Sequence, residues 1–195
     1  MIVGVDEAGR GALAGPVVAA AVWLPPDMDD QCFKDSKVLS PARREFLFQL
    51  LVESDARIGV GVLSHRYIDQ VNILQATMEA MRRSVFAIGE IPSKVLIDGN
   101  RSPDLGGILC EAIVDGDATV TCISAASIVA KVTRDRIMCA LHSKFPEYGF
   151  AIHKGYGTCA HFQAIFDHGQ TSVHRMTFNV SRQLELIEEK LRCLV

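Results

Sequence analysis

The sequence predicts one α/β domain with a mixed sheet, spanning residues 1–195. Three observations lead to this class: short apolar runs open the chain, a central apolar strand is flanked by helical patterns, and the second half is mostly helical. The length of 195 residues suits one domain, since domains average about 150 residues. We expect residues from about 160 to 195 to form a helical C-terminal appendage.

Strands are expected where short apolar or alternating runs end at turn-forming residues. Pro25-Pro26 ends one such run, and Asp98-Gly99-Asn100 ends another. The expected strands are Ile2–Val5, Val17–Leu24, Arg57–Leu63, Lys94–Ile97, Ala112–Val114 and Thr119–Cys122.

Helices are expected from capping residues and from apolar positions three or four apart. Ser40 is placed as an N-cap and Pro41 as the first residue of a helix that runs to about Glu53. The other expected helices are Ile68–Ile88, Ser124–Phe145, Cys159–Asp167 and Arg182–Cys193.

Composition excludes several classes of protein. Hydrophobic residues make up 49% of the chain and charged residues 22%, which is typical of a folded globular protein. The net charge of −3 excludes a protein that coats nucleic acid by bulk charge, although local basic patches stay possible. The sequence has no apolar run of about 20 residues and no basic leader, so a cytoplasmic protein without membrane contact is expected. The six cysteines form no Cys-x-x-Cys pair, so neither a zinc ribbon nor a thioredoxin-type centre is indicated. Without an export signal these cysteines are expected to be reduced, and a monomer is expected.

Acidic residues follow several of the predicted strands: Asp6-Glu7, Asp98, and the pair Asp115 and Asp117. Two carboxylates about 4 Å apart repel by about 4 kcal/mol at an effective dielectric of 20, so a converging set must share protons or hold cations. Oxygen-only ligands favour Mg²⁺ or Mn²⁺. The alternative is that each aspartate only caps a turn. Strand geometry also sends neighbours to opposite faces, so Asp6 and Glu7 share a site only if the strand ends or twists between them.

The glycine-rich segment Gly9-Arg10-Gly11 precedes Ala14 in a G-x-G-x-x-A pattern, which is also the fingerprint of dinucleotide-binding enzymes. Two features argue against that function: the adjacent carboxylates would repel a pyrophosphate, and a strand follows where the fingerprint requires a helix. Glycines flanking an arginine also let backbone N–H groups approach a sugar or phosphate closely, and a plain tight turn is the remaining alternative.

Basic and aromatic residues suggest contacts with nucleic acid. Ser127, Lys131 and Arg134 share one helical face, from which the two basic residues are expected to contact phosphates, unless this is simply a solvated face. Tyr156 lies between two glycines, where its ring is able to stack on a sugar or base. An ordinary loop tyrosine is the alternative.

These segments together resemble the ribonuclease HII family, the bacterial type 2 ribonuclease H. The matching segments, in order along the chain, are Val5–Gly11 with Gly15–Val18, Asp35–Lys37 with Leu39-Ser40, Asn72–Leu74 with Ala76–Met78, Ile97–Asn100, Gly116-Asp117, Ser124–Val132 with Arg134-Asp135, and His153–Thr158. The resemblance implies a ribonuclease H-like fold, with a central mixed β-sheet flanked by helices and a helical C-terminal portion.

The resemblance also implies the site residues. It assigns the catalytic, metal-binding carboxylates to the set Asp6, Glu7, Asp98 and Asp117. It assigns recognition of the 2′-hydroxyl to Gly9, Arg10 and Gly11. It assigns stacking on the neighbouring deoxyribose to Tyr156 and a phosphate contact to Lys37. The family often has a lysine where this chain has Asp115, which leaves open whether Asp115 or Asp117 completes the set.

The implied activity is hydrolysis of RNA in RNA/DNA hybrids and cleavage 5′ of single ribonucleotides in duplex DNA. Two divalent ions, Mg²⁺ or Mn²⁺, would activate a water, and the ends would be 3′-hydroxyl and 5′-phosphate. The implied role is ribonucleotide removal in replication and repair. A module that binds hybrids without cutting them is the further alternative. The segment Gln183–Ile187 resembles a motif that docks on the sliding clamp, but an amphipathic helix is the favoured explanation, because short motifs often match by chance.

Overall fold

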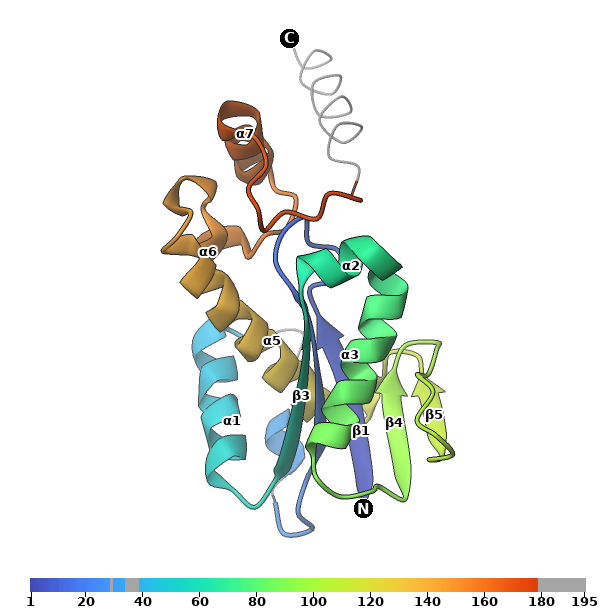
Figure 1. Ribbon diagram of the computed structural model, residues 1–195. Helices are drawn as coiled ribbons and strands as arrows, with labels where there is room; N and C mark the ends of the chain where they lie inside the picture. Colours follow the sequence, from blue (N-terminus) through green and yellow to red (C-terminus); the bar gives the residue numbers. More distant parts are fainter. Residues whose placement is uncertain (29, 34–38, 179–195) are drawn as a thin grey trace.

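A mixed five-stranded sheet forms the centre of the computed structural model, which describes residues 1–28, 30–33 and 39–178 (Figure 1). The strand order is β3-β2-β1-β4-β5. The pairs β1–β2 and β2–β3 are antiparallel, whereas β1–β4 and β4–β5 are parallel. The strands are β1 (Ile2–Ala8), β2 (Val17–Trp23), β3 (Arg57–Leu63), β4 (Lys94–Asp98) and β5 (Cys110–Ile113).

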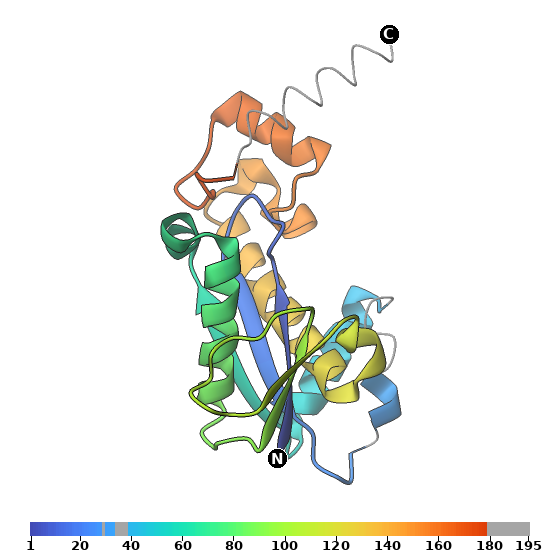
Figure 2. The same ribbon diagram turned by 90° about the vertical axis from the view of Figure 1, so that its right-hand side faces the viewer.

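Helices cover both faces of this sheet. Helix α3 covers one face, and the long helix α5 with α1 covers the other, as the two views show (Figures 1 and 2). No helix of the described residues is long and apolar enough to span a bilayer. The helices are η1 (Asp30–Phe33), α1 (Pro41–Glu53), α2 (His65–Val71), α3 (Ile73–Ala87), α4 (Gly116–Thr119), α5 (Thr121–His142), η3 (Pro146–Tyr148), α6 (Phe150–His153) and α7 (Cys159–His168).

Close approach of the helices to the sheet depends on glycines in the strands. A Cβ on Gly59 or Gly61 of β3 would clash with backbone oxygens of α3. A Cβ on Gly4 of β1 would clash with the first turn of α5. Because alternate residues of a strand point to the same face, Asp6 points toward α5 like Gly4. This orientation brings the first acidic residue under the long helix.

The segments after α5 pack against the loop that joins β1 to β2. Leu13 and Ala14 of this loop are buried in a cluster with Met138, Tyr148 and Phe150. The loop also forms single backbone bridges with the residues that precede α7 and with those that follow it. The β1–β2 loop is therefore held from outside the sheet as well as by its own strands.

Most of the predicted elements are confirmed, with two corrections. The first helix begins as predicted, because the Ser40 hydroxyl accepts a hydrogen bond from the Arg43 N–H at 3.2 Å. The prediction of one helix over Ile68–Ile88 is wrong: Asn72 takes a φ of 73°, ends α2 and caps α3. The strand predicted at Thr119–Cys122 is also wrong, since these residues end α4 and begin α5. The expected helix at Arg182–Cys193 lies outside the described residues.

Candidate active site

Three of the predicted carboxylates gather at the carboxyl ends of β1 and β4. The two strands run parallel with Val5 opposite Ile97, so Asp6 and Asp98 each follow a paired residue at the same edge of the sheet. Glu7 comes next on β1. The charge of Asp98 affects both Asp6 and Glu7, which shows that the three side chains lie within electrostatic reach of one another.

The fourth carboxylate joins them from α4. The N–H of Asp117 donates to Oδ1 of Asp98 at 3.2 Å, and Asp117 is only 6% exposed. Asp115 is exposed and has a left-handed backbone with a φ of 53°. The geometry therefore favours Asp117 over Asp115 as the fourth member of the set.

Asp6 and Glu7 are consecutive residues of β1, which continues to Ala8, yet their carboxyl groups lie within hydrogen-bond reach of each other. Asp6 is nearly buried, and its carboxylate accepts the Glu7 N–H at 2.7 Å as well as a hydrogen bond from Ser127. The Glu7 carboxylate forms an ion pair with Arg10 at 3.1 Å. Glu7 therefore shares this edge with Asp6, although regular alternation along a strand would send the two side chains to opposite faces.

The electrostatics of this edge are unfavourable for negative charge. Burial raises the pKa of Asp6 well above its usual value, and the charges of Glu7 and Asp98 raise it further. Burial also raises the pKa of Glu7, although Arg10 opposes that change. Carboxylates in such surroundings are stabilised by protons or by a cation.

The donor set fits a divalent ion in its chemistry. It consists of carboxylate oxygens, which Mg²⁺ and Mn²⁺ prefer. Burial and the charges of Glu7 and Asp98 raise the pKa of Asp6, so a cation beside it would stabilise the ionised carboxylate. Within the described ranges, however, no three His, Cys, Asp or Glu side chains are already arranged as an ion cage. The carboxylates are thus brought to one edge of the sheet without being closed around an ion.

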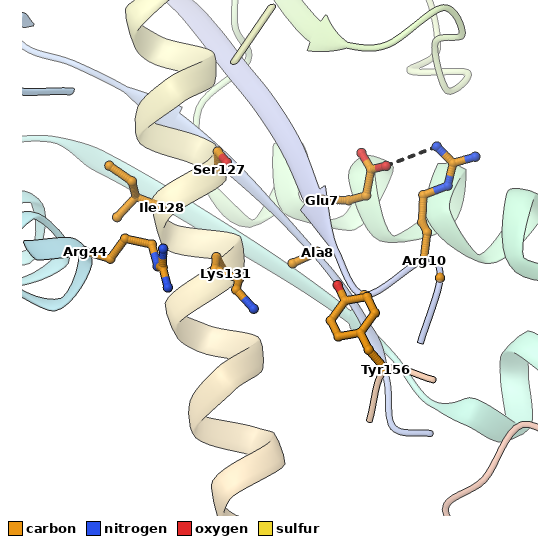
Figure 3. Close-up of a pocket in the computed structure, with 10 residues that line it drawn as sticks. Glu7, Ala8, Arg10, Arg44, Ser127, Ile128, Lys131 and Tyr156 are labelled. Atoms are coloured by element: carbon orange, nitrogen blue, oxygen red, sulfur yellow. Dashed lines mark hydrogen bonds and ion pairs between the residues drawn. The ribbon is translucent and has the colours of Figure 1, made fainter. Parts of the chain in front are cut away.

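A pocket of about 370 Å³ adjoins Glu7 on the α5 side of the sheet (Figure 3). Lys131 from α5 and Tyr156 from the loop after α6 face each other there, with the Lys131 Nζ 5.7 Å from the centre of the tyrosine ring. Five of the predicted substrate-binding residues line this pocket. They are Gly9, Arg10, Gly11, Lys131 and Tyr156.

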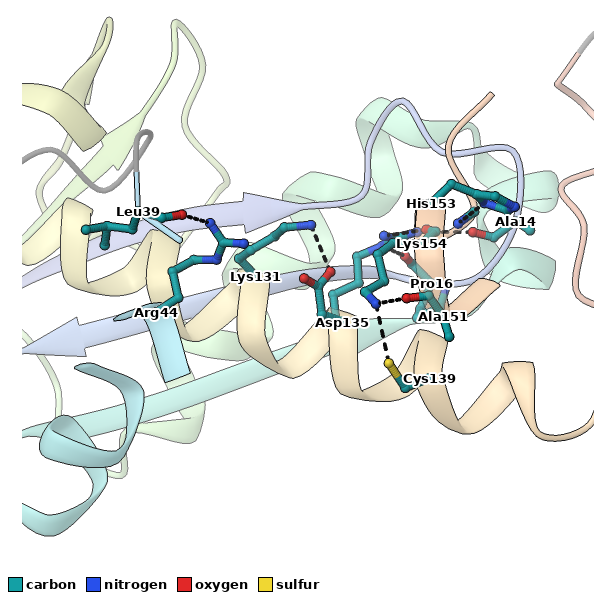
Figure 4. Close-up of polar contacts among 12 residues, drawn as sticks. Ala14, Pro16, Leu39, Arg44, Lys131, Asp135, Cys139, Ala151, His153 and Lys154 are labelled. Carbon is teal, nitrogen blue, oxygen red and sulfur yellow. Dashed lines mark hydrogen bonds and ion pairs between the residues drawn. The ribbon is translucent and has the colours of Figure 1, made fainter. Parts of the chain in front are cut away.

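The pocket continues into a second groove along α5, which Lys131 and Arg44 also line. Figure 4 shows Lys131 turned toward Asp135, with its Nζ 2.8 Å from a carboxylate oxygen, and Arg44 donating to the Leu39 carbonyl. Both cations are therefore present at the pocket but already partly engaged.

Arg134 is placed differently from the prediction. Its side chain is fully buried, and the guanidinium donates to the carbonyls of Ala14, Pro16 and Lys154 at 2.9–3.1 Å. Although Arg134 follows Lys131 by three residues, it runs beneath the β1–β2 loop and leaves no group for a phosphate. The structure thus assigns Arg134 to holding the loop.

Arg175 is a residue that the sequence reasoning missed. It is fully buried and donates to four carbonyls of the β1–β2 loop at 2.7–3.2 Å. Two of these belong to Gly9 and Arg10. Burial and the nearby Arg134 lower the pKa of Arg175. No local pattern marks such a residue, because its partners lie about 160 positions away in the sequence.

Two predicted features fall outside the described residues: Lys37 and the segment Gln183–Ile187.

Comparisons with known proteins identify the family. The model of the family "Ribonuclease HII" matches residues 3–181. The chain belongs to the ribonuclease HII family. A ribonuclease HII of Polynucleobacter asymbioticus is 54% identical over 187 residues, which cover 94% of this chain and 95% of that protein.

Solved structures agree with this assignment. The ribonuclease H2 of Pyrococcus horikoshii OT3 has a TM-score of 0.76 and 29% identity, covering 98% of each chain. The RNase HII in a PCNA complex from Archaeoglobus fulgidus also has a TM-score of 0.76, with 27% identity over 91% of this chain and 95% of that one. The ribonuclease H-like fold predicted from the sequence is confirmed, and the chain is a ribonuclease H, an endonuclease that hydrolyses phosphodiester bonds.

Proposed function

We propose that this endoribonuclease of RNA/DNA hybrids also cuts duplex DNA on the 5′ side of a single embedded ribonucleotide. The products are a 3′-hydroxyl and a 5′-phosphate end, and the mechanism uses two divalent ions, Mg²⁺ or Mn²⁺. The observation that carries the proposal is the position of the buried carboxylates next to the pocket lined by Gly9–Gly11 and Tyr156. Hydrolysis and recognition of the sugar are thus adjacent.

Asp6, Glu7, Asp98 and Asp117 act as the metal ligands. Divalent ions held by these residues would supply an activated water and stabilisation of the leaving 3′ oxygen. Ser127 and the Glu7 N–H orient the Asp6 carboxylate, and Arg10 orients that of Glu7. No side chain of the chain is required as a nucleophile.

The β1–β2 loop recognises the 2′-hydroxyl through Gly9, Arg10 and Gly11. The fold itself does not require a glycine at position 11, and this supports the proposed role of Gly11. Its φ is not positive, and an added Cβ would meet no atom within 4 Å. Gly9, by contrast, has a φ of 97°, and a Cβ there would clash with Arg134. A glycine with open space beside it, in a loop lining the pocket, suits close approach of a ligand.

The remaining contacts follow from the pocket. Tyr156 stacks on the deoxyribose next to the ribonucleotide, and Lys131 contacts a phosphate. The phosphate contact predicted for Lys37 stays a prediction.

The alternative of a dinucleotide-binding enzyme finds no support in the topology. The β1–β2 loop leads into a strand antiparallel to β1, whereas the fingerprint needs a helix N-terminus at that point.

The test uses a DNA duplex with one internal ribonucleotide, with the same duplex lacking it as control. We expect one cut 5′ of the ribonucleotide in Mg²⁺ or Mn²⁺ and none in EDTA. Asp6→Asn and Asp98→Asn are expected to lower the rate at least about 100-fold, or roughly 2.7 kcal/mol in activation free energy. Binding without cutting in both metals, or full cutting by either variant, would overturn the assignment.

Gly11→Ala tests recognition separately from folding. Since the fold has room for the methyl group, thermal stability should stay within about 0.5 kcal/mol of wild type while KM for the ribonucleotide substrate rises. An unchanged KM would remove Gly11 from the recognition site.

A role in ribonucleotide removal during replication and repair agrees with this activity. The Archaeoglobus fulgidus protein forms a complex with PCNA, a sliding clamp, and we propose a similar contact for this chain through Gln183–Ile187. A pull-down with purified clamp, using the chain with and without Leu184→Ala, tests it. The monomeric state and the cytoplasmic location stay predictions.

A further inference from the structure

The loop that carries Tyr156 is fixed through three consecutive carbonyls. Arg134 donates to the carbonyl of Lys154 at 2.9 Å, and a backbone N–H of the β1–β2 loop donates to that of Gly155 at 2.8 Å. The third carbonyl, of Tyr156 itself, lies 3.0 Å from Nδ1 of His161. Lys154 and Gly155 have φ values of 53° and 80°, so this backbone depends on the groups that hold it.

His161 is one end of a buried pair of imidazoles. Its Nε2 lies 3.1 Å from Nε2 of His174, and the two residues are 0% and 1% exposed. At the far end, the Thr171 N–H donates to Nδ1 of His174 at 2.8 Å, and the Thr171 hydroxyl lies 2.8 Å from the same nitrogen. Each imidazole nitrogen of the pair therefore has a partner.

The two ends of this chain of hydrogen bonds fix the position of every proton in it. A backbone N–H only donates, so Nδ1 of His174 is unprotonated and its Nε2–H donates to Nε2 of His161. His161 must then carry its proton on Nδ1, where the Tyr156 carbonyl accepts it. Only one tautomer of each neutral histidine satisfies all three bonds.

The segment that contains His174 also holds the recognition loop. His174 bridges to Ala14, and the next residue, Arg175, donates to the carbonyls of Gly9 and Arg10. One segment thus contacts the loop that reads the 2′-hydroxyl and, through His161, the loop that carries Tyr156. The two imidazoles also pack against the rings of Tyr148 and Phe150, so hydrogen bonds and aromatic contacts together define this arrangement. Fully satisfied buried networks favour a single geometry.

We propose that His161 and His174 form a tautomer-specific relay that sets the position of Tyr156 relative to the Gly9–Gly11 loop. They are positioning residues for discrimination of the ribonucleotide–deoxyribonucleotide junction. This inference rests on the proposed function, since it assumes that Tyr156 and the glycine loop contact neighbouring sugars of one strand.

The relay has a spectroscopic signature that needs neither substrate nor variant. In protein labelled with ¹⁵N-histidine, the two-bond couplings of the ring protons report which nitrogen is protonated. We expect His161 as the Nδ1–H tautomer and His174 as the Nε2–H tautomer at pH 7.5. Finding Nε2–H on both residues would overturn the relay, whatever the enzyme cuts.

Two substitutions of His161 separate positioning from simple stability. The amide of an asparagine is able to occupy the place of imidazole Nδ1 and donate to the Tyr156 carbonyl, whereas a leucine is not. We expect His161→Leu to lower kcat/KM on a single-ribonucleotide duplex about 10-fold, mainly through KM, and on a continuous RNA/DNA hybrid less than about 3-fold. His161→Asn should restore most of the loss.

The double variant with Tyr156→Ala completes the test. If His161 acts through Tyr156, His161→Leu adds no further loss of selectivity between the two substrates once the tyrosine is absent. Equal losses on both substrates, or additive effects in the double variant, would overturn the inference. If His161→Leu does not fold, the selectivity of His161→Asn and the tautomer measurement still test whether His161 positions Tyr156. Failure of the wild-type enzyme to cut at single ribonucleotides would instead count against the proposed function.

Discussion

Replacing Asp6 by asparagine should stabilise the metal-free protein while abolishing its activity. Burial and the charges of Glu7 and Asp98 raise the pKa of Asp6, so its ionised form opposes folding. Two charges about 4–6 Å apart at a dielectric of 20 repel by about 3–4 kcal/mol, which sets an upper limit on the gain in the free energy of unfolding. An asparagine still accepts the Glu7 N–H through Oδ1, so we expect a net gain of about 1–2 kcal/mol. For a chain of this length that is a rise of roughly 3–6 °C in Tm.

The pH dependence gives the sign of this effect independently. Because the folded pKa is raised, folded wild-type protein keeps a proton that the unfolded chain releases near pH 4, and its stability falls as pH rises above that value. The advantage of Asp6→Asn in EDTA should therefore grow as pH rises from about 4 and then level off. Added Mg²⁺ should raise the Tm of wild type and not that of the variant.

Asp69→Asn is the matched control, because its carboxylate is in the opposite situation. It accepts hydrogen bonds from the N–H groups of Met176 and Thr177 and from the Thr177 hydroxyl, and these bonds lower its pKa. We expect Asp69→Asn to lose roughly 1 kcal/mol, a modest cost because the group is partly exposed. Urea unfolding in EDTA at pH 8 measures both. A destabilised Asp6→Asn would refute the reasoning that repulsion dominates at this edge.

Two further predictions concern the buried cations and imidazoles. Burial lowers the pKa of His161 and of His174 to about 4, so their contribution is complete above pH 6.5 and is lost as pH falls toward 4, by roughly 3 kcal/mol for each. Urea unfolding between pH 7.5 and 4.5 should show this slope, reduced in His161→Asn, and an unchanged slope would contradict it. Arg175→Lys should cost about 2–4 kcal/mol, since one ammonium cannot reach all four carbonyls, whereas Arg136→Lys at the surface should be near neutral by thermal unfolding. Equal stability of these two variants would contradict the role of Arg175.

The parts of the fold that the sequence predicts well are those with local causes. Ser40 and Pro41 mark the start of α1 because capping involves neighbouring residues, and the alternation of Arg57–Leu63 marks β3 because burial follows the strand period. The helix break at Asn72 is not predictable in this way. Asn72 interrupts a continuous helical pattern by adopting a positive φ, a conformation that asparagine tolerates but that no local sequence pattern indicates. Thr119–Cys122 is misread because its short β-favouring run is overridden by packing in α4 and α5.

The same distinction applies to the site. The carboxylates are predictable because strand ends gather residues that are remote in sequence, and the parallel pairing of β1 with β4 places Asp6 and Asp98 at the same edge of the sheet. A phosphate contact is predicted for Arg134 because helical spacing shows which face of the helix a residue lies on. The spacing does not show that the β1–β2 loop covers that face. Arg175 and His174 are invisible to local patterns, since their partners are backbone groups of distant loops.

The site combines two kinds of environment, and this difference governs how it responds to substitution. In the recognition loops the polar groups are matched: buried guanidiniums and imidazoles hold carbonyls from Gly9 to Pro16 and from Lys154 to Tyr156. Removing a donor there costs a buried hydrogen bond, even where a carbonyl such as that of Tyr156 keeps a second donor, so loss of recognition and loss of stability come together. At the carboxylate edge the groups repel one another instead, and removing a charge relieves the fold. Variants of Asp6 should therefore lose activity without losing stability, which makes them the cleaner probes of catalysis. Variants of the loops need the selectivity and tautomer measurements to separate the two effects.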